Sequence, residues 1–300
     1  MRKEVGFEDM KIFRPGYAIE YDFFPPTQLD ISLETKLVKG LFFAGQINGT
    51  TGYEEAGCQG LMAGINAYKF TRNEEPLVIK RSEGYIGVLI DDLVNKGTNE
   101  PYRMFTSRAE YRILLRQDNA DLRLTPIAKS IGMNHMDDRM ERVKQKLDNK
   151  KAIEKYFEKY SIDPDVINSR LSELGSSPIK QKVRLKSILS RPNISVPTLL
   201  EVLPEVKAHL AQYDEETINL AEVSLKYEGY IKREQEMVDK MNRLEQVKLT
   251  DTVNYHDLVS LSLEAREKLT EIKPKTIGQA SRISGVSPSD VSVLLVHMGR

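Results

Sequence analysis

The glycine-rich stretch at residues 40–64 constrains the fold most, because it joins an apolar run to a helical pattern. Residues 41–44 predict a buried strand, and Gly45, Gly49 and Gly52 follow it in a turn. Glycines there let the backbone adopt positive φ and let a ligand approach the main chain. The first-turn N–H groups of the following helix suit a phosphate or another electron-rich group. Strand, turn and helix in this order predict one unit of an α/β nucleotide-binding sheet.

The rest of the first 80 residues adds little to such a sheet. Residues 17–24 form a second strand-like run, bounded by Pro25-Pro26, and a helix is predicted over residues 53–70. A Rossmann-like domain needs several parallel strands, and this chain contains one strand–turn–helix unit. Residues 1–80 are therefore predicted to be the C-terminal piece of a larger α/β domain.

Three further glycines fall on one face of the predicted helix: Gly57, Gly60 and Gly64. Each costs about 1 kcal/mol relative to alanine inside a helix. Their shared face predicts a close contact, either with a cofactor or with an adjoining sheet and no ligand. Cys58 is the only cysteine of the chain. A lone helical cysteine among small residues is interpreted as a packing residue.

From residue 84 onward the chain is predicted to be helical. Apolar residues recur at helical spacing, with charged residues on the other faces, through residues 84–95, 137–160, 179–190 and 215–246. Near the C-terminus, Thr276-x-x-Gln279 predicts a capping box, and Ser287-Pro288 predicts a helix start.

Changes of pattern near residues 80 and 222 divide the chain into three domains. They are an α/β remnant, a helical middle domain with an arginine–aromatic segment, and a C-terminal helical domain, at residues 1–80, 81–221 and 222–300. The fold class is therefore mainly α-helical, with an N-terminal remnant of a Rossmann-like α/β domain followed by helical domains.

Composition limits the classes of partner and site. Lys plus Arg and Asp plus Glu both number 44, so any contact with nucleic acid must come from a local patch. One cysteine and four scattered histidines predict no disulfide and no metal site. No apolar run approaches the roughly 20 residues that span a bilayer, and the first residues lack the apolar core of a signal peptide. We expect no membrane contact and a cytoplasmic location.

Residues 100–124 are rich in arginine. Ser107-x-x-Glu110 is a capping-box pattern and predicts that a helix starts close to it. Such a helix would carry three arginines on one face: Arg108, Arg112 and Arg116. A strand over residues 111–116 is the competing prediction.

Aromatic residues alternate with these arginines: Tyr102, Phe105 and Tyr111. Guanidinium groups pair with phosphates and aromatic rings stack on splayed bases, so the segment predicts an RNA-binding surface. The alternative is a salt-bridged helix face, because three carboxylates lie close by in the sequence: Glu110, Asp118 and Asp121.

The end of the chain has a helix–turn–helix pattern over residues 276–284 and 288–298. A DNA-recognition helix needs side chains that reach phosphates and base edges. The second helix contains five Val or Leu residues and has no Lys or Arg before Arg300. We therefore expect it to pack in a core or against a protein partner, and we expect no DNA binding.

Residues 40–64 and 100–124 resemble the two signature sequences of the MnmG (GidA) family. The resemblance continues through residues 226–230, Lys-Tyr-Glu-Gly-Tyr, and through residues 277–286. Members of this family are the FAD-binding subunit of the tRNA uridine 5-carboxymethylaminomethyl modification enzyme. The resemblance implies that the chain is the C-terminal part of such a protein, and that its α/β remnant belongs to an FAD-binding domain.

The resemblance also assigns candidate site residues. The flavin contact falls on Gln46, and the residues that close or line the cofactor site are Gly45, Asn48, Thr50, Thr51, Gly52, Tyr53 and Glu54. The tRNA-binding surface includes Arg103, Arg108 and Arg112, with Tyr102 and Tyr111 as the stacking residues. The catalytic residues stay unknown, because the family's GxGxxG, its nicotinamide-binding region and its catalytic cysteine match no segment of this chain.

The implied activity is modification of the wobble uridine of tRNA at C5. It uses FAD, with NADH and methylene-tetrahydrofolate as co-substrates, and a partner GTPase of the MnmE type that docks on the C-terminal domain. A homodimer is implied, and the isolated chain is predicted to be inactive. Two alternatives stay open, a folate- and FAD-dependent tRNA uridine methyltransferase and a non-catalytic tRNA-binding or adaptor module. The methyltransferase lacks a helical domain like residues 222–300.

Overall fold

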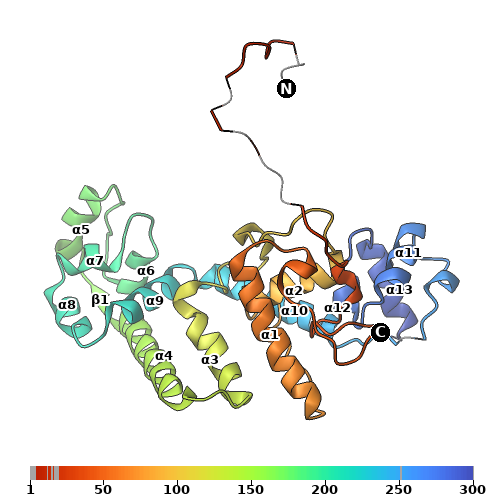
Figure 1. The fold of residues 1–300 in the computed structure, drawn as a ribbon. Helices are drawn as coiled ribbons and strands as arrows, with labels where there is room; N and C mark the ends of the chain where they lie inside the picture. The colour runs from red at the N-terminus through yellow and green to blue at the C-terminus, as the bar shows by residue number, and fades with distance from the viewer. Residues whose placement is uncertain (1–4, 12, 15, 17–19, 251, 300) are drawn as a thin grey trace.

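The computed structural model describes residues 5–11, 13, 14, 16, 20–250 and 252–299. The α-helices are α1 (Tyr53–Thr71), α2 (Tyr85–Lys96), α3 (Ala120–Ser130), α4 (Met136–Lys159), α5 (Pro164–Glu173), α6 (Leu185–Leu189), α7 (Val196–Leu200), α8 (Pro204–Leu210), α9 (Glu215–Lys226), α10 (Glu228–Glu245), α11 (Leu263–Ile272), α12 (Ile277–Ala280) and α13 (Pro288–His297). The shorter elements are η1 (Pro26–Gln28), η2 (Gly45–Asn48), η3 (Thr106–Arg108), η4 (Gln117–Asn119), η5 (Tyr255–Asp257), β1 (Ser161–Ile162) and β2 (Val183–Arg184). They form an elongated body, with α4–α9 at one end, α1, α2 and α10 in the centre, and α11–α13 at the other end (Figure 1).

The mainly α-helical fold is confirmed. The helices predicted at residues 53–70, 84–95 and 137–160 are α1, α2 and α4, each within one residue at either end. The prediction for residues 179–190 is wrong in its first half. The Asn168 side chain binds both the N–H and the carbonyl of Ile179, at 2.7 and 3.0 Å, and holds that stretch outside a helix. The helix predicted over residues 215–246 is interrupted at Tyr227, between α9 and α10.

The strand predicted at residues 41–44 is wrong. Phe42 makes a single bridge with Glu34, and the Phe43 N–H donates to the Leu33 carbonyl at 3.1 Å. A strand needs a continuous ladder, and these neighbouring segments pair at isolated residues. Of the run at 17–24, residues 17–19 lie outside the described residues, and residues 20–24 form no strand. Within the described residues, the one sheet is the antiparallel pair of β1 and β2.

Both helix starts predicted near the C-terminus are confirmed. The Thr276 side chain accepts from the Gln279 N–H, and Ser287 forms a capping box with Asp290. The Gln279 carboxamide accepts from the Lys275 N–H at 2.7 Å, so the reciprocal half of the first predicted capping box is wrong. The helix α12 ends four residues before the predicted limit of residue 284.

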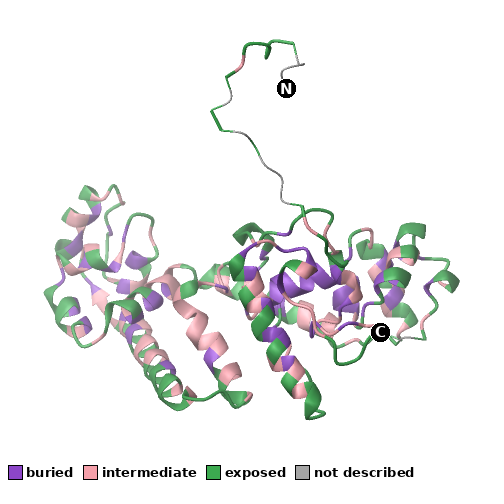
Figure 2. Ribbon diagram, in the orientation of Figure 1, coloured by how far each residue is buried: buried purple, intermediate pink, exposed green. Residues whose placement is uncertain are grey.

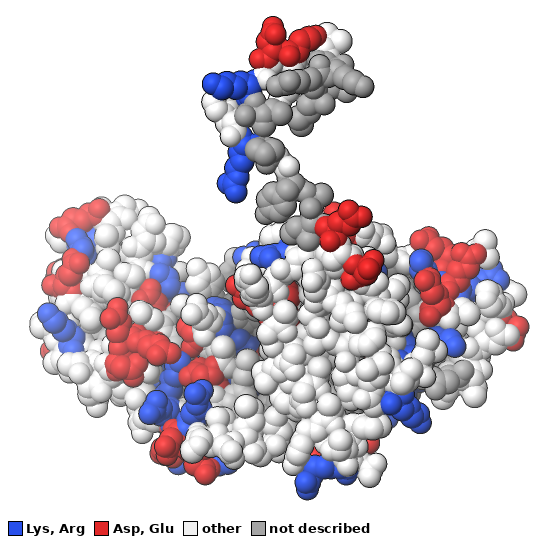
Figure 3. Space-filling model, in the orientation of Figure 1, with Lys and Arg blue, Asp and Glu red and all other residues white. Residues whose placement is uncertain are grey.

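Buried residues gather in the three parts of the body (Figure 2). One cluster lies among α4–α9 and includes Phe157 and Ile188. A second lies among α11–α13 around Leu269. A third forms where α1 and α2 pack against Leu29 and Leu33. Charged side chains are frequent at both ends of the body, whereas the face over α1 shows few of them (Figure 3).

The central helix α2 is buried along its length from Gly87 to Asn95. Apolar residues cover most of its surface, which is typical of a helix in the core. Asp91 and Asp92, which the sequence pattern places on a charged face, are 2% and 1% exposed. Buried carboxylates are stable only when cations or hydrogen-bond donors meet them.

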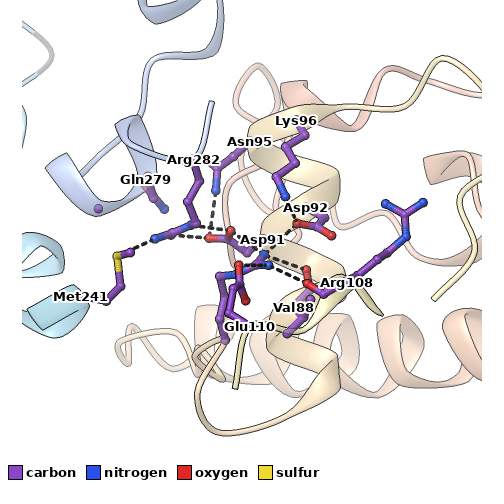
Figure 4. Close-up of polar contacts among 12 residues, drawn as sticks. Val88, Asp91, Asp92, Asn95, Lys96, Arg108, Glu110, Met241, Gln279 and Arg282 are labelled. Carbon is purple, nitrogen blue, oxygen red and sulfur yellow. Dashed lines mark hydrogen bonds and ion pairs between the residues drawn. The ribbon is translucent and has the colours of Figure 1, made fainter. Parts of the chain in front are cut away.

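Two arginines from distant parts of the chain meet these carboxylates, and Figure 4 shows one of them, Arg282, beside Asp91. Arg81 Nη1 lies 3.0 Å from Asp91 Oδ2 and 2.8 Å from Asp92 Oδ1. Arg282, which follows α12, binds Asp91 through Nη2 and Nε at 2.6 and 2.7 Å. Its Nη1 lies 2.6 Å from Glu245 Oε1 at the end of α10. The ion pair between Arg282 and Asp91 therefore connects the C-terminal part of the chain to the central helix α2.

Gly87 makes this arrangement sterically possible. A Cβ atom at Gly87 would lie 2.3 Å from the carbonyl oxygen of Lys80 and 2.4 Å from that of Ile79. The segment before α2 thus crosses the helix in direct backbone contact. This crossing places Arg81 beside Asp91.

Replacing Arg282 with alanine is expected to lower the free energy of unfolding by about 3–5 kcal/mol, because Asp91 would lose one of its two arginines in a buried site. Chemical denaturation followed by circular dichroism measures this. Lys268→Ala is the matched control, since its pair with Glu271 is exposed and contributes at most about 1 kcal/mol. Equal stability losses in the two variants would show that apolar contacts alone hold the C-terminal part.

Candidate functional site at the glycine-rich turn

Gln59 of α1 holds the glycine-rich turn in place. Its Oε1 accepts from the Gly45 N–H at 3.2 Å and from Asn48 Nδ2 at 2.8 Å, and its Nε2 donates to Thr50 Oγ1 at 2.9 Å. Thr50 Oγ1 donates in turn to the Gly45 carbonyl at 3.0 Å. Gly45 and Gly49 have φ of 85° and 77°, the left-handed region that favours glycine. The turn is therefore fixed by a buried polar network.

The candidate cofactor residues divide by burial. Gly45, Asn48, Thr50 and Gly52 are buried, Thr51 is half-buried, and Gln46, Tyr53 and Glu54 are exposed. The Asn48 and Thr50 side chains are engaged in the turn itself. The helix α1 starts after Gly52, and no side chain caps its first turn. Uncapped N–H groups at a helix start remain available to a ligand.

The glycine-rich turn and the arginine–aromatic segment lie side by side. Thr50 and Tyr102 form a parallel bridge, and the Tyr102 N–H donates to the Gly49 carbonyl at 2.8 Å. The Glu55 carboxylate of α1 accepts from the Met104 N–H at 2.8 Å. The two stretches that carry the family resemblance therefore form one structural unit.

The helix predicted from Arg108 is wrong, and so is the competing strand over residues 111–116. Arg108 ends the 3-10 turn η3, and residues 109–116 form turns and bends. Glu110 does not cap a helix, because its carboxylate pairs with Arg81 Nη2 at 2.7 Å. The arginines of the segment consequently do not share one helical face.

The helix α10 holds the end of the segment. Glu234 accepts from the N–H groups of Ile113 and Leu114 at 3.1 and 3.0 Å, so the backbone donors are used in tertiary contacts. Arg116 pairs with Asp118, with Nε 2.9 Å from Oδ1. This ion pair agrees with the alternative in which nearby carboxylates pair with the arginines.

Three arginines of the segment reach the surface with different partners. Arg112 is exposed and makes no hydrogen bond or ion pair with any described residue. The Arg108 guanidinium lies over the Tyr102 ring, 4.3 Å from its centroid, and Nε donates to the Arg103 carbonyl at 2.8 Å. Arg103 is 52% exposed, with Nε 3.8 Å from Glu55 Oε1. Much of their donor capacity is left for other acceptors.

The tyrosines predicted to stack on bases, Tyr102 and Tyr111, are each 5% exposed. The Tyr102 hydroxyl donates to Asp92 Oδ2 at 2.9 Å, and burial together with this carboxylate raises the pKa of Tyr102. Tyr111 packs in one cluster with Val88. Phe105, the third ring of the segment, is 58% exposed and is the one that faces solvent.

The glycine face of α1 is open. A Cβ atom at Gly57, Gly60 or Gly64 would meet no atom of the described residues within 4 Å, so the predicted close contact is not found there. Leu61 and Tyr68 are exposed on the same helix. Cys58 packs against the buried cluster of Leu89, and burial raises the pKa of its thiol.

The sequence gives little indication of which residues position the candidate site. Gln59 and Glu55 lie within a helix whose glycines dominate the pattern. Arg81 stands outside every predicted helix. The available signal is the pair Asp91 and Asp92 inside an apolar run, because two buried carboxylates require partners.

No three or more His, Cys, Asp or Glu side chains are placed together to hold a metal ion in the part of the chain that the structure describes. Among those same residues, no helix is both long and apolar enough to cross a bilayer. The candidate site is built from backbone amides, carboxamides and guanidinium groups.

Three protein-family models match the chain in succession. Glucose inhibited division protein A matches residues 1–75. The C-terminal helical domain of the tRNA modifying enzyme MnmG/GidA matches residues 137–235, and the C-terminal helical bundle of the same enzyme matches residues 237–300. Two of these models are named for one tRNA modifying enzyme, and together the three models match most of the chain.

The chain belongs to the MnmG (GidA) family, as the sequence resemblance predicts. It is 58% identical over 300 residues to the tRNA uridine 5-carboxymethylaminomethyl modification enzyme MnmG of Cytophaga hutchinsonii, covering 100% of this chain and 48% of that protein. The corresponding protein of Parabacteroides distasonis is 54% identical, with 98% and 48% covered. Aquifex aeolicus GidA in its form II crystal superposes with a TM-score of 0.79 at 38% identity, over 98% of this chain and 46% of that one. The chain spans about half the length of the relatives it matches.

Replacing Gln59 with leucine is expected to lower the free energy of unfolding by about 1–3 kcal/mol or more. The reason is that Gly45, Asn48 and Thr50 each lose a buried hydrogen bond. Thermal melting measures the loss, and hydrogen exchange of the peptide over the turn should become faster. Gln181→Leu is the control, since Gln181 is exposed and makes no hydrogen bond with described residues. Unchanged exchange at the turn in the Gln59 variant would contradict the role of this network.

Proposed function

We propose that this chain is part of an FAD-dependent enzyme that, with a partner GTPase, adds a carboxymethylaminomethyl or aminomethyl group to C5 of the wobble uridine of tRNA. The observation that carries the proposal is the contact between the glycine-rich turn and the arginine–aromatic segment, through the Thr50–Tyr102 bridge and the Glu55–Met104 hydrogen bond. A surface suited to a cofactor thus adjoins one suited to a polyanion. The activity named for the relatives supports the same function.

The residues present fit the flavin edge of FAD. The first turn of α1 offers uncapped N–H groups, and Gln46 adds an exposed carboxamide. Glu54 and Glu55 lie in that turn, and their charges oppose a phosphate, so a neutral carbonyl edge is the better ligand. Bound FAD supplies the redox and one-carbon chemistry that side chains lack. The run from Gly45 to Glu54 binds and orients that edge.

The tRNA grip is assigned to Arg103, Arg108 and Arg112. Their guanidinium groups are at the surface, and the chain as a whole has no net charge, so attraction to tRNA depends on this local group. Tyr102 and Tyr111 support the loop from beneath, and Phe105 is the ring available to stack on a base.

The remaining parts of the proposal follow from family membership. Residues 1–80 contribute to the FAD-binding domain, residues 81–221 carry the tRNA-facing segment, and residues 222–300 dock the partner GTPase. NADH and methylene-tetrahydrofolate are co-substrates, the enzyme is a cytoplasmic homodimer, and this chain alone is inactive. The methyltransferase alternative is not favoured, because a family-specific helical-bundle model matches residues 237–300.

The double variant Arg108→Ala/Arg112→Ala is expected to weaken binding of unmodified tRNA about tenfold at low salt. It should also flatten the dependence of log K on log salt by about 2, one for each lost phosphate contact. Fluorescence anisotropy over a salt series measures both. Arg139→Ala/Arg142→Ala is the matched control, because it removes the same charge from exposed positions on α4.

Equal weakening by both double variants would indicate general electrostatic attraction and contradict the assigned grip. The adaptor alternative is tested separately by titrating the chain with FAD and following flavin fluorescence. Salt-sensitive tRNA binding without any flavin binding favours a tRNA-binding module over a contribution to the cofactor site.

A further inference from the structure

Glu55 of α1 contacts the arginine–aromatic segment, and it is 4% exposed. Its Oε1 accepts from the Met104 N–H at 2.8 Å and lies 3.8 Å from Arg103 Nε. Its Oε2 is buried and has no hydrogen-bond partner among the described residues. A buried carboxylate ordinarily has several partners, so one with a single hydrogen bond requires an explanation.

Gly52 provides the space in which the Glu55 carboxylate meets the Arg103 guanidinium. A Cβ atom at Gly52 would lie 1.6 Å from Glu55 Oε2 and 2.9 Å from Arg103 Nη1. The φ of Gly52 is −85°, a value that any residue adopts, so glycine is needed here for space and not for backbone freedom. The two side chains therefore meet against the Gly52 backbone.

We propose that Glu55 is a positioning residue for Arg103, and that its carboxylate fixes where this guanidinium stands on the RNA-facing surface. The inference rests on the tRNA-binding function proposed above. Glu55 occupies the third position of α1, where the positive end of the helix dipole favours a carboxylate. Arg103 is held by this carboxylate on the protein side, while half of its side chain stays open to solvent.

The influence of Glu55 extends to a second arginine. Arg108 Nε donates to the carbonyl of Arg103, so the backbone position of Arg103 also sets the Arg108 guanidinium. The Glu55 bond to the Met104 N–H fixes that same stretch of backbone. One buried carboxylate thus places two of the three surface arginines. Oε2 has no partner among the described residues and is free to accept a hydrogen bond. A ligand that covers Arg103 and excludes water would strengthen the attraction between this carboxylate and the guanidinium.

A double-mutant cycle on binding of unmodified tRNA by the 300-residue chain tests the inference. Arg103→Ala should weaken binding about fivefold and flatten the salt dependence by about 1. Glu55→Gln should weaken binding about threefold, although it removes a negative charge that repels RNA. Combined with Arg103→Ala, it should have no further effect. The glutamine oxygen still accepts from the Met104 N–H, so the backbone that places Arg108 is kept and only the contact with the Arg103 guanidinium is lost. Glu75→Gln is the charge-matched control, since Glu75 is exposed and has no partner among described residues.

Gly52→Ala is an independent probe, because the added methyl displaces the Glu55 carboxylate without removing its charge. It should weaken tRNA binding about threefold, as Glu55→Gln does. It also keeps the test decisive if the Glu55 variant loses its helical circular dichroism. Wild-type affinity in Gly52→Ala, additive losses in the double variant, or tighter binding by Glu55→Gln would each overturn the inference.

The outcomes separate this inference from the proposed function. If Arg103→Ala leaves affinity and salt dependence unchanged while the Arg108 and Arg112 double variant weakens binding, the positioning role of Glu55 is overturned and the proposed function stands. If none of these arginine variants changes tRNA binding, the RNA surface itself is overturned and the inference falls with it.

Discussion

Asp91 joins three parts of the chain through its two arginines. Arg81 comes from the segment before α2, and Arg282 lies 191 residues from Asp91, after α12. The side chains of Arg81, Asp91 and Arg282 are at most 10% exposed, so these ion pairs are largely shielded from water and are stronger than surface pairs. Through Glu245, the same network also includes the end of α10. The C-terminal part is therefore positioned by charge as well as by apolar packing.

The same network of buried charges also contacts the arginine–aromatic segment of the candidate site. Arg81 also pairs with Asp92 and Glu110, and the Tyr102 hydroxyl donates to Asp92. Burial acts to raise the pKa of Asp92, but Arg81 and Lys96 outweigh it and hold that pKa below its ordinary value. The loop that presents the surface arginines is thus anchored beneath by buried charges. On its other side it is anchored by the glycine-rich turn.

The sequence pattern predicted those helices whose ends and buried faces are set by residues close in sequence. The helices α1, α2 and α4 follow from apolar spacing, and the cofactor residues named from residues 45–54 stay a prediction. The helix predicted from Arg108 failed because its capping residue, Glu110, is taken by Arg81, which lies 29 residues away. The backbone donors that follow are taken by Glu234, 121 residues from Ile113. Arg81 and Glu234 both lie far from Arg108 in the sequence, so the local pattern could not reveal these contacts.

Glu55 has a consequence for how members of this family can be recombined. A chimera that joins residues 43–59 of this chain to a segment without arginine at position 103 would keep the backbone N–H at position 104 but leave the buried carboxylate without its guanidinium. In the reverse exchange, a parent without a carboxylate at position 55 would leave Arg103 without its ion-pair partner. A crossover between Glu55 and Arg103 therefore keeps the contact only where both parents have these residue types, whereas a crossover outside residues 55–103 takes both residues from one parent.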